Sequence, residues 1–333
     1  ASKCILCGDC VRMCNEVQNV GAIDFAHRGS KMTVSTAFNI PIAESNCVGC
    51  GQCAAVCPTA AIIVKNDCHK LWYDLNKEDT RVIVQIAPAV RVAVAKAFGY
   101  KGDDVMGKIV AALRRLGFSH IFDTATGADL TVLEEANEFL ERLESGEKLP
   151  LFTSCCPAWI RYCEEKYPEL LPNVSTCRSP MEMFASVIHE HYKNSSKRII
   201  SVAVMPCSAK KFEAAREEFR VDGKPLVDYV ISTQELIQMI KEAGIVFGEL
   251  APEGVDMPFG TISGAGVIFG VTGGVTEAVL RRVTNDKSQA MLRQIAMTGV
   301  RGFDGIKEFT VPYGDRELKI GVVSGLANAE KVI

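Results

Sequence analysis

The chain has 333 residues, enough for two or three domains with a sizeable hydrophobic core. Its formal net charge is −3, so no basic surplus indicates a nucleic-acid partner, and no apolar run of about 18 or more residues predicts a membrane span. Its 14 cysteines are clustered, whereas disulfide frameworks are typical of small secreted domains. We therefore expect metal thiolates in a reducing compartment, the cytoplasm.

Two similar cysteine runs stand near the start of the chain, KCILCGDCVRMC and NCVGCGQCAAVCP. Both read C-x2-C-x2-C-x3-C, a spacing in which three thiolates converge on one cubane and the fourth reaches a second cubane. The alternative is a pair of structural zinc sites, but zinc favours separated C-x2-C pairs. The first predicted [4Fe–4S] cluster is held by Cys4, Cys7, Cys10 and Cys57, and the second by Cys47, Cys50, Cys53 and Cys14.

Residues 1–78 are thus expected to form a two-[4Fe–4S] ferredoxin-like domain that transfers electrons. Between the two runs, the alternation of TVSTAF and the glycines around it predict a hairpin insert.

From about Arg81 onward the pattern changes to strands that alternate with helices. Predicted strands are RVIVQIAP, SHIFDT, LFTS and RIISVAVMPC, with FTVPY and ELKIGVVSG as a closing pair. Predicted helices are DDVMGKIVAALRRLG, GADLTVLEEANEFLERLESG, PAWIRYCEEKYPELL, TQELIQMIKEAG with a Thr233 cap, and GVTGGVTEAVLRRV. This alternation predicts an α/β architecture, which we expect as two lobes with mixed sheets flanked by helices.

Two further cysteines, Cys156 and Cys207, each follow a predicted strand, where α/β folds gather ligands. Lys210 stands three residues after Cys207. Two thiolates and an ammonium indicate a third metal site that carries an anionic ligand or substrate. The alternative is a pair of buried free cysteines.

TSCCPAW, MPCSAKKFEA and SGAGVIFGVTGGVTEAVLR together resemble motifs of the [FeFe]-hydrogenases, and the resemblance runs over nearly the whole chain. The first 25 residues are also similar to catalytic subunits of multi-subunit, NAD-linked hydrogenases. The resemblance implies a catalytic domain over residues 79–333. It also implies an H-cluster, in which a cubane is joined through a cysteine to a diiron unit with carbon monoxide, cyanide and azadithiolate. Protons, electrons and H2 interconvert there. Implied partners are ferredoxin or flavin/NAD-linked iron–sulfur subunits and maturation proteins.

Carried onto matching positions, the resemblance makes Cys156 and Cys207 ligands of the H-cluster cubane. It makes Cys155 the proton donor to the azadithiolate nitrogen. Glu135, Ser175 and Glu138 match the family's proton relay, and Glu135 and Glu138 share one helix face at i and i+3. For LEEANE alone, a solvated acidic helix face is the alternative. Lys210 would hold a cyanide by a charge-assisted hydrogen bond. The diiron pocket would be lined by Met205, Phe269, Ala87 and Pro88, with Ala89 at the bridge, where relatives often have serine.

Relatives carry two more ligand cysteines in a later stretch that resembles ACxGGC. This sequence stops at Ile333, after GVVSGLANAEKVI. We therefore expect a catalytic domain truncated before its last cysteine motif, with the full cofactor absent from the chain alone or completed by another chain. The remaining cysteines, Cys68, Cys163 and Cys177, are expected to be small buried hydrophobic residues.

Two other functions stay open. Eukaryotic relatives serve iron–sulfur protein assembly without evolving hydrogen, although a scaffold needs no proton path. A hydrogen sensor is expected to carry signalling modules, and none is present in this sequence.

Overall fold

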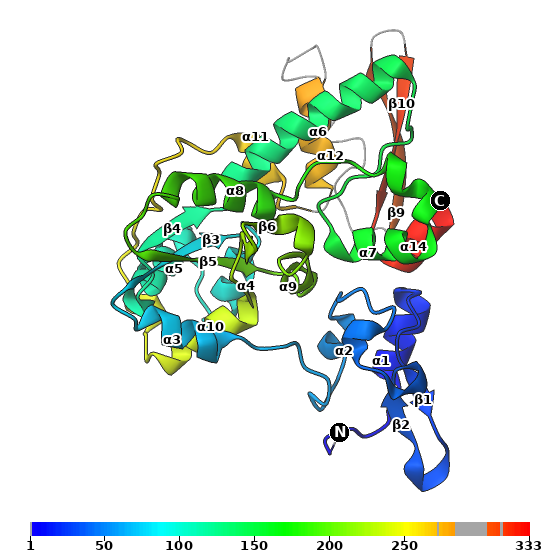
Figure 1. The fold of residues 1–333 in the computed structure, drawn as a ribbon, viewed down its shortest axis with the longest axis horizontal. Coiled ribbons are helices and arrows are strands. Elements are labelled where there is room, and N and C mark those ends of the chain that lie inside the picture. Colours follow the sequence, from blue (N-terminus) through cyan, green and yellow to red (C-terminus); the bar gives the residue numbers. More distant parts are fainter. Residues whose placement is uncertain (1, 272, 284–304, 314–315) are drawn as a thin grey trace.

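The computed structural model describes residues 2–271, 273–283, 305–313 and 316–333. A parallel sheet in the order β4–β3–β5–β8 lies at the centre of the larger part of the molecule (Figure 1). Its strands are β3 (Thr80–Ile86), β4 (His120–Asp123), β5 (Arg198–Met205) and β8 (Tyr229–Ser232). The α/β architecture and the first three of these strands are confirmed, whereas β8 was not predicted.

Helices cover both faces of this sheet, which explains why its strands are nearly continuous apolar runs. Successive side chains of β3 point to opposite faces. Val82 and Val84 join the same core as Ile109, whereas Ile83 packs in a separate cluster with Phe184. The helices of this part are α3 (Cys68–Leu75), α4 (Val90–Ala97), α5 (Val105–Leu116), α6 (Ala125–Ser145), α8 (Pro180–Tyr192), α9 (Ala209–Glu213), α10 (Thr233–Glu242), α11 (Gly264–Ile268) and α12 (Gly274–Val283).

A second, antiparallel pair of strands lies beside the C-terminal half of α6 (Figure 1). The strands β9 (Ile306–Tyr313) and β10 (Arg316–Val323) confirm the predicted closing pair. Val311 and Leu318 are buried against Phe139 of α6 and Leu280 of α12. Each described sheet is therefore of one kind, parallel or antiparallel, because the closing pair forms its own layer instead of joining the central sheet.

The N-terminal region is built from short elements around its cysteine loops (Figure 1). The predicted hairpin insert is confirmed, since β1 and β2 pair antiparallel. Nearby, α7 (Pro157–Lys166) and α14 (Leu326–Val332) pack against this region. The short elements are α1 (Asp9–Arg12), β1 (Asp24–Ala26), β2 (Thr33–Ser35) and α2 (Gln52–Ala55). A separate two-stranded pair, β6 (Arg220–Val221) and β7 (Lys224–Pro225), follows α9.

Three local predictions were wrong. LFTS is no strand of the sheet, because Phe152 pairs only with Val174 in an isolated bridge. The helix that begins at Pro157 ends at Lys166, because the proline at 168 forces Tyr167 out of helical geometry (φ −136°, ψ 54°). The cap of α10 is Ser232, not Thr233: the Ser232 hydroxyl accepts the Glu235 N–H at 3.2 Å, and Glu235 accepts the Ser232 N–H in return.

None of the helices in the described ranges combines the length and the apolar character that crossing a bilayer requires.

Candidate active site and its electron and proton routes

The thiols predicted for the second cluster line one apolar cavity. Cys47, Cys50 and Cys53 come from the second run, and Cys14 comes from the first. Gly51 adopts φ +72° just before α2, a left-handed conformation that turns the loop so that its cysteines face the cavity. In the described residues, no three His, Cys, Asp or Glu side chains stand close enough to hold a single metal ion. Four thiols around one apolar cavity fit a larger, soft iron–sulfur cluster.

Three thiols of the first predicted set lie near one another at α1. Cys10 lies close enough to Cys4 and Cys7 for their charges to raise its pKa, although burial raises it most. Cys57 stands apart as the last cysteine of the second run. Backbone N–H groups of Ile62 and Thr59 lower its pKa to about 7, and Ala61 N–H lies 3.2 Å from its Sγ. A thiolate is the form that binds iron, so this thiol is suited to the role.

The cavity lined by Cys14, Cys47, Cys50 and Cys53 lies directly against the segment that follows β5. Cys47 and Cys50 pack in one cluster with Cys207, which follows β5. The Ser208 hydroxyl donates to the Gly49 carbonyl at 2.9 Å. A Cβ on Gly51 would lie only 2.3 Å from Ser208 Oγ, so only glycine fits here without a shift. The cysteine loop and the Cys207 segment are therefore held in contact.

The predicted pocket residues gather at the carboxyl edge of the central sheet. Ala87 follows β3 and donates its N–H to the Val204 carbonyl at 3.0 Å, one residue before Met205 on β5. Pro88 faces the glycine-rich segment, since a Cβ on Gly270 would lie 3.0 Å from Pro88 Cβ. Phe269, which ends α11, precedes that glycine, and Ala89 begins α4. Parallel strands collect ligands at this edge.

Gly266 of the glycine-rich segment lies against α6, because a Cβ there would be 2.5 Å from the Ala125 carbonyl oxygen. Its small size lets α11 pack tightly on α6, while Gly270 is the glycine that faces the pocket edge.

Cys207 follows β5 as predicted, but Cys156 does not follow a strand of the sheet. Cys156 has extended geometry (φ −99°, ψ 105°) and begins α7, whose first residue is Pro157. Cys155 precedes it, and its carbonyl accepts a hydrogen bond of 3.0 Å from Lys210 Nζ. The same ammonium lies 2.7 Å from Glu213 Oε2. Lys210 therefore joins the thiol pair to a buried carboxylate that was not predicted.

The predicted relay side chains come together between α6 and the segment before α8. Ser175 Oγ donates to Glu138 Oε2 at 2.6 Å, and Arg142 donates to Glu138 Oε1 at 2.5 Å. Glu138 has a lowered pKa, because hydrogen bonds from Ser175, Thr176 N–H and Arg142 outweigh its burial. Arg142 also donates to the Asn173 and Val174 carbonyls at 3.1 and 3.0 Å, so it fixes the Ser175 segment on the helix.

Glu135 lies one helical turn before Glu138 and is 2% exposed. Burial, together with the charge of Glu138, raises its pKa to about 7. Among the described residues, its Oε2 has no hydrogen-bond partner. Among the charged groups around Cys155, Glu135 raises the pKa of that thiol most, after the effect of burial. A carboxyl that titrates near neutrality between a thiol and a serine–carboxylate pair can accept and release a proton.

The sequence analysis did not identify Glu182 or Glu213. It also expected Cys177 to be a buried hydrophobic residue, whereas Cys177 is half-buried and has polar neighbours. Cys177 donates its N–H to Ser175 Oγ at 3.2 Å, and its Sγ lies 3.7 Å from Glu138 Oε2, so it belongs to the relay region. Cys68 and Cys163 are buried as predicted, at 5% and 0% exposure. The i, i+3 spacing of Lys210 and Glu213 was the one signal that could have indicated their ion pair.

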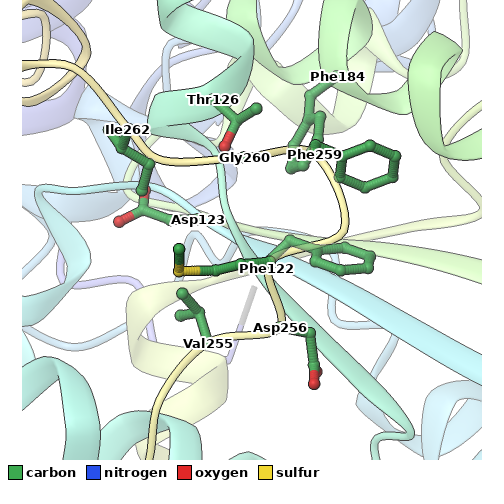
Figure 2. Close-up of a pocket in the computed structure, with 10 residues that line it drawn as sticks. Phe122, Asp123, Thr126, Phe184, Val255, Asp256, Phe259, Gly260 and Ile262 are labelled. Atoms are coloured by element: carbon green, nitrogen blue, oxygen red, sulfur yellow. The ribbon is translucent and has the colours of Figure 1, made fainter.

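Another hollow lies at the carboxyl end of β4 (Figure 2). It is lined mainly by the aromatic rings of Phe122, Phe184 and Phe259, together with Asp123 and the segment around Asp256. The Asp123 carboxylate accepts the Ala125 N–H, the first N–H of α6, at 2.8 Å. None of the predicted site residues lines this hollow, which is a packing feature of the sheet edge.

Comparison with known proteins identifies the family of the chain. Residues 80–333 match the family described as "Iron only hydrogenase large subunit, C-terminal domain", and residues 3–61 match the "4Fe-4S dicluster domain". The NADP-reducing hydrogenase subunit HndD of Solidesulfovibrio fructosivorans is 44% identical over 99% of this chain. The chain spans 58% of that relative's length.

An apo [FeFe]-hydrogenase structure from Chlamydomonas reinhardtii superposes with a TM-score of 0.68 at 37% identity, over 80% of this chain and 77% of that one. A more distant relative is a cytosolic Fe-S cluster assembly factor of Xenopus tropicalis, 28% identical over 74% of this chain and 56% of its own. With a family match over most of its length and a relative above 40% identity across it, the chain belongs to the iron-only [FeFe]-hydrogenase large-subunit family.

Proposed function

We propose that the protein containing this chain is a hydrogenase that interconverts H2 with two protons and two electrons. The observation that carries the proposal is that a set of cluster thiols and a chain of proton-carrying groups both end at neighbouring cysteines. The thiols of the second cluster cavity pack against Cys207, and the carboxyl–serine relay leads to Cys155. Electron carriers and proton carriers thus arrive at neighbouring thiols, as the chemistry of this reaction demands.

The residues present fit the proposed cofactors to different degrees. The four thiols of the second set line one cavity and fit one [4Fe–4S] cluster, and Cys4, Cys7 and Cys10 fit three ligands of another, with Cys57 proposed as the fourth. Cys156, Cys207, Lys210 and the apolar wall of Met205, Phe269, Ala87, Pro88 and Ala89 fit the part of an H-cluster that they would face. The resemblance implies two further ligand cysteines for the H-cluster. None of the unassigned cysteines, Cys68, Cys163 and Cys177, has the spacing expected of them. When bound, the H-cluster would supply the site at which H2 is made or split.

The chain's own residues would deliver the protons. Ser175 and Glu138 hold one hydrogen-bonded pair at the outer end, beside Arg142. Glu135 would pass a proton between this pair and the Cys155 thiol, which needs a small movement of its unpartnered Oε2. Because Glu135 has a pKa of about 7, neither direction of transfer is strongly opposed at neutral pH.

We place the division between the electron-transfer and catalytic domains at residues 78 and 79. By analogy with the NADP-reducing relative, electrons would come from or go to ferredoxin or flavin/NAD-linked iron–sulfur subunits in the cytoplasm. Maturation proteins would insert the diiron unit.

A role in iron–sulfur protein assembly is the second candidate, favoured by the match to the cytosolic assembly factor. The two roles make different demands on Cys155, which a scaffold does not need as a proton donor.

Hydrogen evolution from a reduced viologen dye tests the proposal on the protein matured with a diiron unit. Cys155→Ala is expected to lower turnover by about 10²–10⁴-fold while the iron content stays unchanged, because the last proton donor is lost. Cys68→Ala, a buried cysteine on α3, is the matched control and should keep its turnover. Equal turnover in the Cys155 variant would remove the relay assignment. Absence of turnover in every form, with full cofactor, would favour the assembly role.

A further inference from the structure

A buried carboxyl that the proposed mechanism does not use interacts electrostatically with Lys210. Glu182 is in the first turn of α8 and is 0% exposed. Among the described residues, neither of its carboxyl oxygens has a hydrogen-bond partner. It occupies the position from which an acidic side chain often caps a helix N-terminus, yet it makes no capping bond to Ser179.

The charged groups that act on Glu182 are Glu213 and Lys210 of α9 and Arg178, which precedes α8. Lys210 is already committed to Glu213 at 2.7 Å. Arg178 donates to Ser186 Oγ at 2.9 Å and lies over the Phe219 ring. Glu213 is itself buried, at 4% exposure. The cluster therefore contains two buried carboxyl groups, one ammonium paired with Glu213, and the Arg178 guanidinium, which is bonded to Ser186.

An ionised carboxylate with no hydrogen bond and no solvent is strongly disfavoured. A second carboxylate in the same buried cluster disfavours it further, as in carboxyl pairs that share one proton. Of the two groups, Glu213 has the ammonium, so Glu182 is the one that keeps a proton. In agreement, burial and then the Glu213 charge raise the pKa of Glu182 to about 8.

We propose that Glu182 is a positioning residue for Lys210: it stays protonated at neutral pH, so that the ammonium faces one carboxylate and can turn toward an anionic ligand. Ionised Glu182 would instead leave two carboxylates competing for Lys210. The inference rests on the proposed function only for the identity of the anionic ligand, a cyanide of the diiron unit.

Infrared spectroscopy on the chain carrying its two [4Fe–4S] clusters, without a diiron unit, tests this directly. At neutral pH the carbonyl stretch of a protonated carboxylic acid should be present in the parent chain and absent from Glu182→Gln. The matched control is Glu190→Gln on the same helix, whose side chain is 68% exposed and which should change nothing. Glu135→Gln identifies the part of the carboxylic-acid band that comes from Glu135.

Two further variants test the cluster rather than burial alone. In Glu213→Gln the titration midpoint of the Glu182 band should fall by about one pH unit or more, because a neighbouring negative charge is gone. In Lys210→Met it should rise by a similar amount, because the ammonium no longer favours the ionised form. Opposite shifts of this kind are not expected from a purely structural residue.

The inference is overturned if the Glu182→Gln spectrum keeps the whole band, or if neither neighbouring substitution moves the midpoint. These results do not depend on cofactor loading. Loss of hydrogenase activity with an intact titration would reject the proposed function and leave the assignment of Glu182 standing.

Discussion

Ser175 donates its hydroxyl hydrogen to Glu138 Oε2 at 2.6 Å, across the gap between α6 and the segment that precedes α8. The pair is held from the other side by Arg142, which bonds both Glu138 and the backbone before Ser175. One helix face and one loop are thus fixed in the register that a proton relay requires.

Removal of this hydroxyl should slow proton delivery. Ser175→Ala is expected to lower hydrogen turnover by about 10²–10⁴-fold without loss of iron, because the link between Glu135 and Glu138 is interrupted. Thr176→Ala is the control, since its side chain is exposed and only its backbone N–H bonds Glu138. Similar rates for the two variants would show that protons take another route.

Glu135 should make stability depend on pH. Its folded pKa, about 7, lies above its ordinary value of 4.5. Between these values the folded state holds more protons than the unfolded state, so the stability contributed by this group falls as pH rises from about 4.5 to 7 and then stays level. Glu135→Gln should therefore raise the free energy of unfolding by up to about 3 kcal/mol above pH 7, and by little near pH 4.5.

Denaturant unfolding at several pH values measures this difference. Glu134→Gln, whose side chain is exposed, is the neighbouring control and should give a flat difference. A Glu135→Gln effect that is the same at pH 5 and pH 8 would contradict the raised pKa.

Arg142 should matter for folding as well as for the relay. It is 8% exposed and bonds one carboxylate and several backbone carbonyls. Arg142→Met leaves Glu138 without its charged partner, so the free energy of unfolding should fall by about 3–5 kcal/mol. Arg115→Met, at an exposed position of α5, should change it by about 0.5 kcal/mol or less. Equal losses would mean that Arg142 only covers apolar surface.

Gly51 should be the glycine that keeps the cluster loop against the catalytic part. Gly51→Ala adds left-handed strain of about 1–2 kcal/mol, and it also displaces Ser208 from its bond to Gly49, about 1 kcal/mol more. Gly29→Ala has φ +60° but nothing within 4 Å of the new Cβ, so it reports the strain alone. The expected signature is a larger loss of stability at position 51, together with slower reoxidation of the reduced clusters by H-cluster turnover. The contact is unimportant if both variants behave alike.

The sequence was sufficient for features that depend on local patterns. Apolar runs identified β3 and β5, because both faces of a covered parallel sheet are buried. Cysteine spacing indicated which four thiols share a cavity, although Cys14 and Cys47 are far apart in the chain.

Features that depend on long-range packing could not be predicted. Phe152 pairs with Val174 rather than with the sheet, because the segment between them, which contains α7, returns the chain to its side. Burial of Glu182 follows from the packing of α8 against neighbouring elements, and a glutamate in a first helical turn is ordinarily solvated. Even the cap of α10 differed by one residue, since serine and threonine stand side by side and only Ser232 has the extended backbone of a cap.

The most direct test of the central claim is an infrared spectrum of the protein that contains this chain, after it has been supplied with its iron–sulfur clusters and a synthetic diiron complex. Convergence of the two routes at Cys155, Cys156 and Cys207 predicts carbon monoxide and cyanide stretches distinct from those of the free complex, with the cyanide stretches altered in Lys210→Met. Only the bands of the free complex, with iron matching two cubanes, would contradict the claim and leave an electron-transfer domain beside an empty pocket.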